Sequence, residues 1–503
     1  MLNVLFITAD QFRGDCLSGV GHPVVRTPNI DRLAEGGVSF GRHFANAAPC
    51  GPSRASLYTG MYLFNHRAAI NGSPLDDRHT NVAREARALG YEPALFGYTD
   101  IGVDPRTVAP DDRALWSYEG VLPGFDPVCH LPEGDPEEWL TWMRKDGVDV
   151  PDEWRPFVDQ PVEGTYGRTQ YDAEHSQTKF LTDRVLDFVE DAGERPWFVH
   201  LSYLRPHPPY LAPAPYDTMY DPATVPAPVR APSRFEEGQQ HDLLGVMIDH
   251  PLIKSPDDDQ AQREFQAVYY GMVTEVDDQL GRLFAWLDET GQADNTIVIF
   301  TSDHGELLGD HWLLQKIGWF DTAYHVPLII RDPRSSFDTT RGTTVEVFTE
   351  HVDVTPTICD LLGADIPLQC DGRPLTPWIA GEAPDGWRDA AHFELDLRDP
   401  DSRFLEDAFG ITLEECSVAI IRDEHGKYVQ FAGHHAFPPI FFDIDTDPEQ
   451  LVNRADDPAY AARVLDYAQR MLSWRMRHNE RTLTGMKLTG HRGLVTYRAP
   501  RLR

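Results

Sequence analysis

Short runs of β-branched and aromatic residues alternate along this chain with longer stretches in which apolar residues recur at helical spacing. The runs typical of strands cover residues 4–8, 94–98, 197–202, 296–301 and 327–331. One helical stretch carries apolar residues at positions 273, 276, 280, 283, 284 and 287, and another extends from about 176 to 189. Because strands that alternate with helices form parallel sheets, the pattern predicts an α/β fold with a mostly parallel central sheet flanked by helices.

The chain changes character in its middle and near its end. Residues 103–165 and 211–262 are rich in Pro, Asp and Trp and lack periodicity, which indicates long ordered loops around a site. After about residue 380, short strand-like runs at 417–422, 427–431 and 440–443 precede a helix predicted over 457–479. We therefore expect a large α/β domain over 1–380 and a smaller α+β subdomain with a C-terminal tail over 381–503.

The charge balance excludes some kinds of partner. The 503 residues include 80 Asp and Glu against 45 Lys and Arg, a formal charge of −35. Nucleic-acid binding and docking on anionic membranes both need basic surface, so we expect neither. With 41% apolar residues, the chain can form a large core, and disorder is not expected.

Neither a membrane span nor a secretory signal is expected. No apolar run approaches ~18 residues, and no basic segment with a cleavage site opens the sequence. The six cysteines form no CxxC pair. Free thiols are typical of a reducing compartment, so we expect a cytoplasmic protein.

Polar side chains follow four of the predicted strands. The segments concerned are Asp10-Gln11, Tyr98-Thr99-Asp100, Arg205-Pro206-His207 and Asp303-His304. A single Asp at a strand end is more often part of a turn than of a site. Ligands of open α/β sheets bind beyond the carboxyl ends of the strands, so polar groups at four such ends favour a functional site.

The chemistry of these side chains suits a divalent metal. Asp10, Gln11 and Asp303 offer oxygen ligands, and His304 offers a ring nitrogen. Oxygens alone would suit Ca²⁺ or Mg²⁺, whereas one imidazole moves the preference toward Mn²⁺, Fe²⁺ or Zn²⁺. His304 by itself would be interpreted as a hydrogen-bonded structural histidine, and its position beside Asp303 favours the metal site.

The segment Cys50-Gly51-Pro52-Ser53-Arg54, which runs on to Gly60, contains the most informative motif of the chain. Pro52 suits a first helical turn and Gly60 suits the position just beyond a helix end. The pattern therefore predicts that Cys50 lies at a helix N-terminus, where free N–H groups favour an anion. The structural alternative is a half-buried thiol that begins a short helix.

This motif resembles the signature of the sulfatases of the alkaline phosphatase superfamily, and the branch of phosphonate monoester hydrolases and related arylsulfatases is the more similar one. The resemblance runs nearly end to end. Its further marks are Asp10-Gln11-x-Arg13, Asn65-His66-Arg67, Gly97-Tyr98-Thr99, Arg205-Pro206-His207-Pro208-Pro209, Thr301-Ser302-Asp303-His304-Gly305-Glu306, Gly309-Asp310-His311, Lys316-Ile317-Gly318, Phe441-Phe442-Asp443 and Ser473-Trp474-Arg475.

The resemblance implies a nucleophile and a metal site. In that family a maturation enzyme oxidises the cysteine, here Cys50, to formylglycine, whose hydrate attacks sulfur or phosphorus. The metal ligands would be Asp10, Gln11, Asp303, His304 and the residue derived from Cys50. The single divalent metal, Mn²⁺ or Ca²⁺ with Zn²⁺ or Fe²⁺ as alternatives, would lower the pKa of the attacking hydroxyl.

The resemblance also assigns roles around the ester. His207 and Lys316 would stabilise or protonate the leaving oxygen, and Arg54 would orient the diol. Tyr98 and Asn71 would contact the non-bridging oxygens. The structural alternatives are a solvated surface lysine for Lys316 and a turn residue for His207.

Three positions depart from common family patterns. Gln11 stands where most sulfatases have a second Asp, and His304 where Asn is frequent. Asp100 stands where the phosphonate-cleaving relatives tend to have a hydroxyl residue. A carboxylate there would repel a monoanionic ester unless it is paired or turned away.

These observations predict a formylglycine- and metal-dependent hydrolase of small monoanionic esters. Aryl sulfate is expected first, followed by phosphonate monoesters and phosphate diesters. One alternative has phosphonate monoester or phosphodiester hydrolysis as the main activity. An alternative of another class is a catalytically silent acidic binding protein on the same fold.

The C-terminal residues bear on assembly. Residues 483–503 carry Lys487, Arg492, Arg498, Arg501 and Arg503 with little apolar periodicity, so they form either a frayed tail or an arm that packs on a neighbouring subunit. Since similar enzymes form dimers or tetramers, we expect a homo-oligomer.

Overall fold

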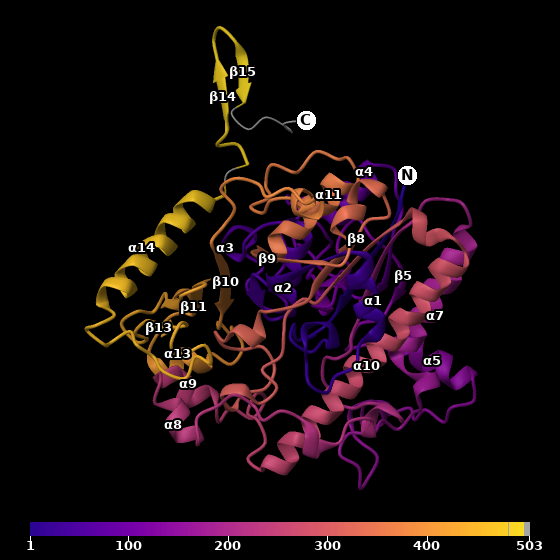
Figure 1. Ribbon diagram of the computed structural model, residues 1–503, viewed down its shortest axis with the longest axis horizontal. Coiled ribbons are helices and arrows are strands. Elements are labelled where there is room, and N and C mark those ends of the chain that lie inside the picture. The colour runs from indigo at the N-terminus through magenta and orange to yellow at the C-terminus, as the bar shows by residue number, and fades with distance from the viewer. Residues whose placement is uncertain (481, 497–503) are drawn as a thin grey trace.

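The computed structural model describes residues 1–480 and 482–496, and its core is an eight-stranded sheet (Figure 1). The strand order is β5-β4-β6-β1-β7-β8-β2-β9. The bounds are β1 Asn3–Ala9, β2 Val38–Phe44, β4 Pro93–Gly97, β5 Asp126–His130, β6 Phe198–Tyr203, β7 Thr296–Thr301, β8 Leu328–Arg331 and β9 Thr343–Glu350. All neighbouring strands are parallel except β8, which is antiparallel to β7 and β2. The expected mostly parallel sheet is confirmed.

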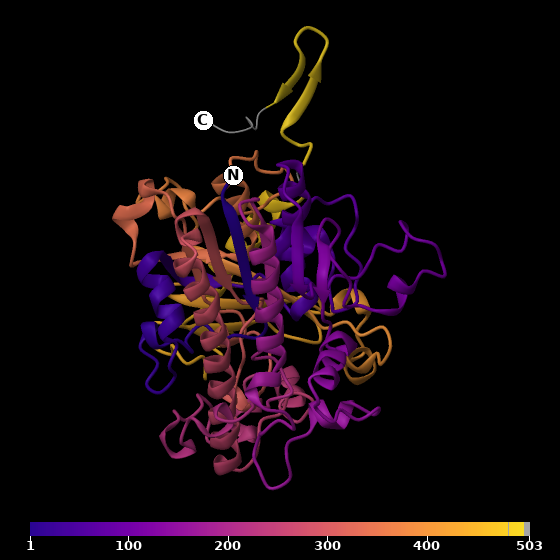
Figure 2. The same ribbon diagram turned by 90° about the vertical axis from the view of Figure 1, so that its right-hand side faces the viewer.

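Helices cover both faces of this sheet because β1 is apolar on both. Leu5 and Ile7 pack on one face against α1 (Pro28–Gly36), α5 (Glu137–Lys145), α7 (Gln177–Ala192) and α10 (Asp259–Glu289). Val4 and Phe6 pack on the other against α2 (Cys50–Thr59), α4 (Val82–Ala88), α11 (Val354–Leu361) and α12 (Thr376–Ile379). Figure 2 shows the two long helices, α7 in magenta and α10 in pink, running beside the strands.

A second sheet forms the C-terminal part, in the order β13-β12-β11-β10-β3. Its strands are β3 Ala47–Ala48, β10 Ala390–Asp396, β11 Ser417–Asp423, β12 Gly426–Phe431 and β13 Ile440–Asp443. Helix α14 (Ala461–His478) packs on it through Tyr467 and Met471. Since β3 ends just before α2, this sheet is joined to the segment that carries Cys50. The three strands and the helix expected here are confirmed, and the boundary near residue 380 stays a prediction.

The expected long loops contain more structure than predicted. Residues 103–165 include β5, α5 and α6 (Arg155–Asp159), and 211–262 include α8 (Arg234–Gly238), α9 (Asp242–Met247) and the start of α10. Strands β2, β5 and β9 were not predicted either. The edge strands β5 and β9 expose several side chains, so they lack the apolar runs that mark central strands. Two further short helices are α3 (Leu63–His66) and α13 (Phe404–Phe409).

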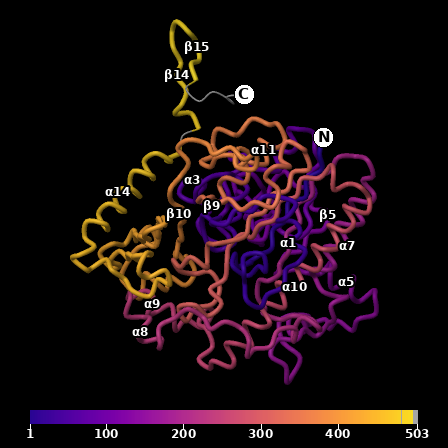
Figure 3. Tube along the Cα trace, viewed as in Figure 1, coloured from indigo at the N-terminus to yellow at the C-terminus, as the bar shows by residue number. Residues whose placement is uncertain are grey.

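A β-hairpin of β14 (Met486–Thr489) and β15 (Gly493–Thr496) stands away from the body of the molecule (Figure 3). Lys487 and Arg492 belong to it, while Arg498, Arg501 and Arg503 lie outside the described residues. None of the six cysteines, all in the described part of the chain, forms a disulfide. No helix among residues 1–480 and 482–496 is long and apolar enough to cross a membrane.

Candidate active site

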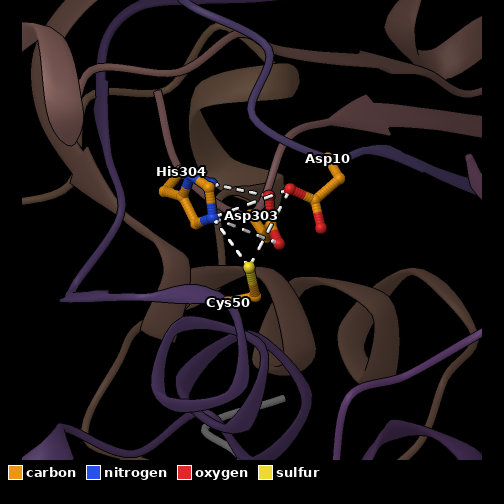
Figure 4. A group of neighbouring side chains, drawn as sticks. All are labelled: Asp10, Cys50, Asp303 and His304. Carbon is orange, nitrogen blue, oxygen red and sulfur yellow. Dashed lines mark hydrogen bonds and ion pairs between the residues drawn. The ribbon is translucent and has the colours of Figure 1, made fainter. Parts of the chain in front are cut away.

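The ends of two neighbouring strands place the acidic side chains of the site. Strand β1 ends at Ala9 and is followed by Asp10, and β7 ends at Thr301 and is followed by Asp303 and His304. Because β1 and β7 pair in parallel, Asp10 and Asp303 leave the same edge of the sheet. Helix α2 brings Cys50 to this edge, below the two carboxylates and the imidazole (Figure 4).

Helix α2 begins at Cys50 for the reasons that its sequence indicates. Pro52 lies in the first turn, and Gly60 follows the last residue with a φ of 70°, a left-handed conformation that glycine adopts without strain. The Gly51 N–H donates to Asn71 Oδ1 at 2.8 Å, so Asn71 caps part of the helix N-terminus. The predicted helix start is confirmed.

Asp10, Cys50, Asp303 and His304 form a buried group whose ligand atoms all lie within 4.8 Å of one another. The Cys50 Sγ lies 3.1 Å from His304 Nε2 and 3.9 Å from Asp10 Oδ1. His304 Nε2 lies 3.7 Å from a carboxylate oxygen of each aspartate. The spacing is that of ligands around one cation.

The tautomer of His304 fits a metal ligand. Its Nδ1 lies 3.0 Å from the Gly305 carbonyl oxygen, to which a ring N–H can donate. The lone pair of Nε2 then faces the cluster, as in metal-binding histidines whose other nitrogen is held by a hydrogen bond. Two carboxylates and an imidazole around one point suit a divalent metal with mixed oxygen and nitrogen ligands.

Arg54 lies behind the carboxylates rather than beside Cys50. Its guanidinium donates to Asp303 Oδ2 at 2.8 Å, to Asp10 Oδ2 at 3.0 Å and to Ser202 Oγ at 2.7 Å. The Tyr98 hydroxyl also donates to Asp10 Oδ2. Burial works against the charged form of Asp10, yet His207 and Arg54 foremost among its neighbours hold the pKa of this carboxyl well below its usual range. Arg54 therefore stabilises the ionised carboxylates, and its predicted contact with the diol stays a prediction.

Gln11 connects the cluster to Lys316. Its Oε1 accepts from Lys316 Nζ at 2.8 Å, and its amide nitrogen donates to Tyr210 Oη at 3.0 Å and to Glu306. Burial opposes the charge of Lys316, but the Cys50 and Asp10 side chains raise its pKa. Lys316 is thus a buried ammonium rather than a surface lysine, and Gln11 as a metal ligand stays a prediction.

A cavity of about 260 Å³ opens in front of Cys50. Predicted residues that line it include Asp10, Asn71, Tyr98, Asp100, His207 and Lys316. His207 Nδ1 lies 2.8 Å from the Pro208 carbonyl oxygen, and burial with Lys316 nearby lowers its pKa to about 3. The imidazole is therefore neutral at pH 7, with Nε2 as an acceptor, so Lys316 is the better proton donor of the two.

The structure brings the predicted residues together and adds others. Ser202, Tyr210 and Glu306 hold Arg54 and Gln11 in place, and Tyr118, Glu119 and Glu133 line the cavity. Glu306 lies within a motif of the family, so that motif could have indicated it. The other lining residues come from the segment 103–165, which the sequence marks as loops around a site without indicating which side chains face it.

The comparisons with known proteins agree with this geometry. Residues 2–364 match the family model of the sulfatases, and 309–477 match that of the C-terminal region of N-sulphoglucosamine sulphohydrolase. The chain belongs to the sulfatase family, and it is a hydrolase of the alkaline phosphatase superfamily.

Three relatives are similar over nearly their whole length. The chain is 42% identical to the multifunctional alkaline phosphatase superfamily protein PehA of Trinickia caryophylli, covering 98% of this chain and 99% of the relative. The structure of the phosphonate monoester hydrolase of Agrobacterium radiobacter matches with a TM-score of 0.94 at 45% identity, covering 99% and 100% of the two chains. That of the phosphonate monoester hydrolase SpPMH from Silicibacter pomeroyi matches with a TM-score of 0.92 at 40% identity, covering 99% of each chain.

Proposed function

We propose that the protein hydrolyses phosphonate monoesters and phosphate diesters, and sulfate monoesters at the same site. The observation that carries the proposal is the position of Cys50, which begins a helix with its Sγ 3.1 Å from His304 Nε2, inside a cluster of metal-ligand geometry. Each of these substrates carries about one negative charge at pH 7. The similarity to two phosphonate monoester hydrolases is the reason to place phosphorus esters, for this protein, ahead of the aryl sulfates expected first from the sequence.

Residue 50 is proposed to act as formylglycine, formed by a maturation enzyme that supplies the oxidant. The hydrated aldehyde would provide a hydroxyl nucleophile, and a divalent metal held by Asp10, Asp303 and His304, with Gln11 beside them, would lower the pKa of that hydroxyl. The second hydroxyl allows the aldehyde to re-form with cleavage of a C–O bond. This release does not require a second attack on phosphorus or sulfur, so it serves both elements.

The remaining residues are proposed to hold the ester and the leaving group. Lys316 presents its ammonium to the cavity and protonates the leaving oxygen, while neutral His207 accepts a hydrogen bond. The Asn71 side chain, whose Oδ1 is used by Gly51, can donate from its amide nitrogen to a non-bridging oxygen. Arg54 forms ion pairs with both aspartates and so holds their carboxylates in place for a cation.

The test combines an assay of ester hydrolysis with a measurement of the mass of the peptide that contains residue 50. Protein purified with its maturation enzyme is assayed on 4-nitrophenyl phenylphosphonate, bis(4-nitrophenyl) phosphate, 4-nitrophenyl sulfate and 4-nitrophenyl phosphate, and the peptide that contains residue 50 is weighed. We expect an aldehyde or its hydrate at residue 50, turnover of the first three esters, and loss of that turnover in Cys50→Ala. A phosphate monoester as the best substrate, or full activity with an intact thiol, would contradict the proposal.

The alternative of a silent acidic binding protein makes an opposite prediction. It requires that none of the four esters is turned over even when residue 50 carries the aldehyde and the protein contains stoichiometric metal.

We further propose that the protein is a homo-oligomer, a dimer or a tetramer, and that the hairpin β14–β15 contacts a second copy. The hairpin projects from the body of the molecule (Figure 3). It carries apolar side chains in solvent, and Leu488 is 83% exposed. Such residues on a projecting arm suit an interface between copies. Deletion of residues 483–503 is expected to lower the molar mass measured by light scattering to that of a smaller assembly. An unchanged mass would contradict the proposed contact.

A further inference from the structure

The cavity in front of Cys50 has an acidic wall that the proposed chemistry does not use. Asp100, Glu119 and Glu133 line it together with the ring of Tyr118. Asp100 follows β4 and Glu133 follows β5, whereas Asp10 and Asp303 follow β1 and β7, closer to the other edge of the sheet. These further acidic side chains therefore lie on the β4–β5 side of the cluster.

Asp100 is the residue of this wall that needs a partner. It is only 5% exposed, and within residues 1–480 and 482–496 no group forms a hydrogen bond or an ion pair with its carboxylate. The guanidinium of Arg54 is already shared between Asp10 and Asp303. A buried carboxyl without a partner keeps its proton, and it ionises where a cation lies beside it, so we expect the partner of Asp100 to arrive with a ligand.

The backbone alone does not explain an aspartate at this position. Asp100 has a φ of 58°, in the left-handed region that Asp and Asn tolerate better than most residues. Asparagine would meet this backbone requirement without a charge. The carboxylate itself is therefore the feature that remains to be explained.

The partner fits an organic cation better than a second metal ion. In the part of the chain that the structure describes, Asp10, Cys50, Asp303 and His304 are the one group of His, Cys, Asp or Glu side chains close enough together to hold a metal ion. Asp100, Glu119 and Glu133 are thus too far apart to close around a metal ion. Glu119 is fixed by the backbone N–H groups of Glu133 and Gly134, and Tyr118 adds an aromatic face. Carboxylates spread around an aromatic ring suit an alkylammonium group.

We propose that the preferred substrates are zwitterionic esters whose retained substituent, the one that stays on phosphorus, carries an ammonium group held by Asp100, Glu133 and Tyr118. Lys316 protonates the leaving oxygen in the proposed function, on which this inference rests. The backbone oxygen of Asp100 and Oδ1 of Asn71 lie 3.1 and 3.2 Å from the position that a Cβ on Gly51 would occupy, so both residues lie beside the start of α2. Asp100 and Glu133 follow β4 and β5, whereas Lys316 follows β7, with β6 and β1 between them. The acidic wall thus faces the retained substituent.

Two phosphate diesters with the same 4-nitrophenyl leaving group test the inference. One retains a 2-(trimethylammonio)ethyl group and the other the isosteric, neutral 3,3-dimethylbutyl group. We expect kcat/KM to be about tenfold higher for the charged ester. Asp100→Asn should bring this ratio of kcat/KM values close to one. Glu190→Gln should leave the ratio unchanged, because it removes an exposed charge at the end of α7 that precedes the start of β6.

Binding separates this inference from the proposed function. In Cys50→Ala protein, calorimetric titration with the two diesters should show the same preference, and the added Asp100→Asn change should remove it. If neither ester is turned over by the mature enzyme but the preference in binding remains, the proposed function fails and the cation site stands. Equal rates and equal affinities for the two esters, or a preference that survives Asp100→Asn, would overturn the cation site.

Discussion

Arg54 Nε donates to Asp303 Oδ2 at 2.8 Å, and neither side chain is accessible to solvent. The same guanidinium donates to Asp10 Oδ2 at 3.0 Å. A residue of the Cys50 helix thus neutralises the carboxylates that follow two strands. Because the contact is fully buried, its loss removes a positive charge that two buried carboxylates share.

Arg54→Met should therefore destabilise the fold as well as the site. Removing one partner of a buried ion pair costs about 3–5 kcal/mol, and urea unfolding would measure it. Arg54→Lys should recover only part of this, since one ammonium cannot reproduce the fork that reaches both carboxylates. Arg32→Gln, which breaks an exposed pair with Asp288, should change the free energy of unfolding by less than about 1 kcal/mol. Equal effects of Arg54→Met and Arg32→Gln would contradict this role.

Lys316→Met should slow turnover most for esters with poor leaving groups. A positioned proton donor contributes roughly 10²–10⁴ in rate, and it matters little when the leaving group is as acidic as 4-nitrophenol. The plot of log kcat/KM against the leaving-group pKa should therefore become steeper in the variant. Lys145→Met, at an exposed position of α5, is the matched control. A uniform loss across leaving groups would assign Lys316 to substrate binding instead.

Asp100→Asn should stabilise the protein more at high pH than at low pH. Burial raises the pKa of Asp100 to about 8 from an ordinary value of 3.8. The folded state therefore holds its proton between these values while the unfolded chain has lost it, so this residue lowers stability as the pH rises from about 4 to 8. Urea unfolding should show a gain of a few kcal/mol for the variant near pH 8.5 that shrinks toward pH 4. Glu190→Gln should show no such trend, and a gain independent of pH would mean that burial does not perturb this carboxyl.

The amount of bound divalent metal should depend on the group formed by Asp10, Cys50, Asp303 and His304. Asp303→Asn should lower the bound divalent metal, measured by atomic emission on dialysed protein, because it removes one charge from the ligand set. Treatment of the parent protein with a chelator should abolish turnover, and refilling with Mn²⁺, Ca²⁺, Zn²⁺ or Fe²⁺ should rank the metals. Glu190→Gln should retain the metal. Full metal content in Asp303→Asn would place the ion elsewhere.

Added salt should raise kcat/KM, or leave it level, for an anionic ester whose retained group is neutral. It should leave kcat/KM unchanged for a zwitterionic ester. The net charge of −35 repels a monoanionic ester at long range. Between about 0.01 and 0.15 M ionic strength the screening length falls from about 30 to 8 Å, so kcat/KM for the 3,3-dimethylbutyl diester should rise or stay level. The ester with no net charge should change little. A steep fall with salt for the anionic ester would indicate a basic approach surface.

The sequence by itself determined β1, β4, β6, β7 and β8, the start of the Cys50 helix and the polar groups that follow β1 and β7. These features depend on residues near one another in the chain, such as Pro52 inside the first turn, Gly60 after the last, and Asp10 after a buried strand. The resemblance to the family added the expectation that Asp10, Cys50, Asp303 and His304 belong to one metal site. Edge strands such as β5 were missed because their exposed side chains carry no apolar pattern.

Only the tertiary structure decided what the side chains of the site contact. It turned Arg54 toward Asp10 and Asp303, tied Lys316 to Gln11, and left the buried carboxylate of Asp100 facing a cavity lined by Glu119 and Glu133. These contacts join segments up to hundreds of residues apart. Their geometry follows from how the sheet and helices pack, which no local pattern of residues encodes.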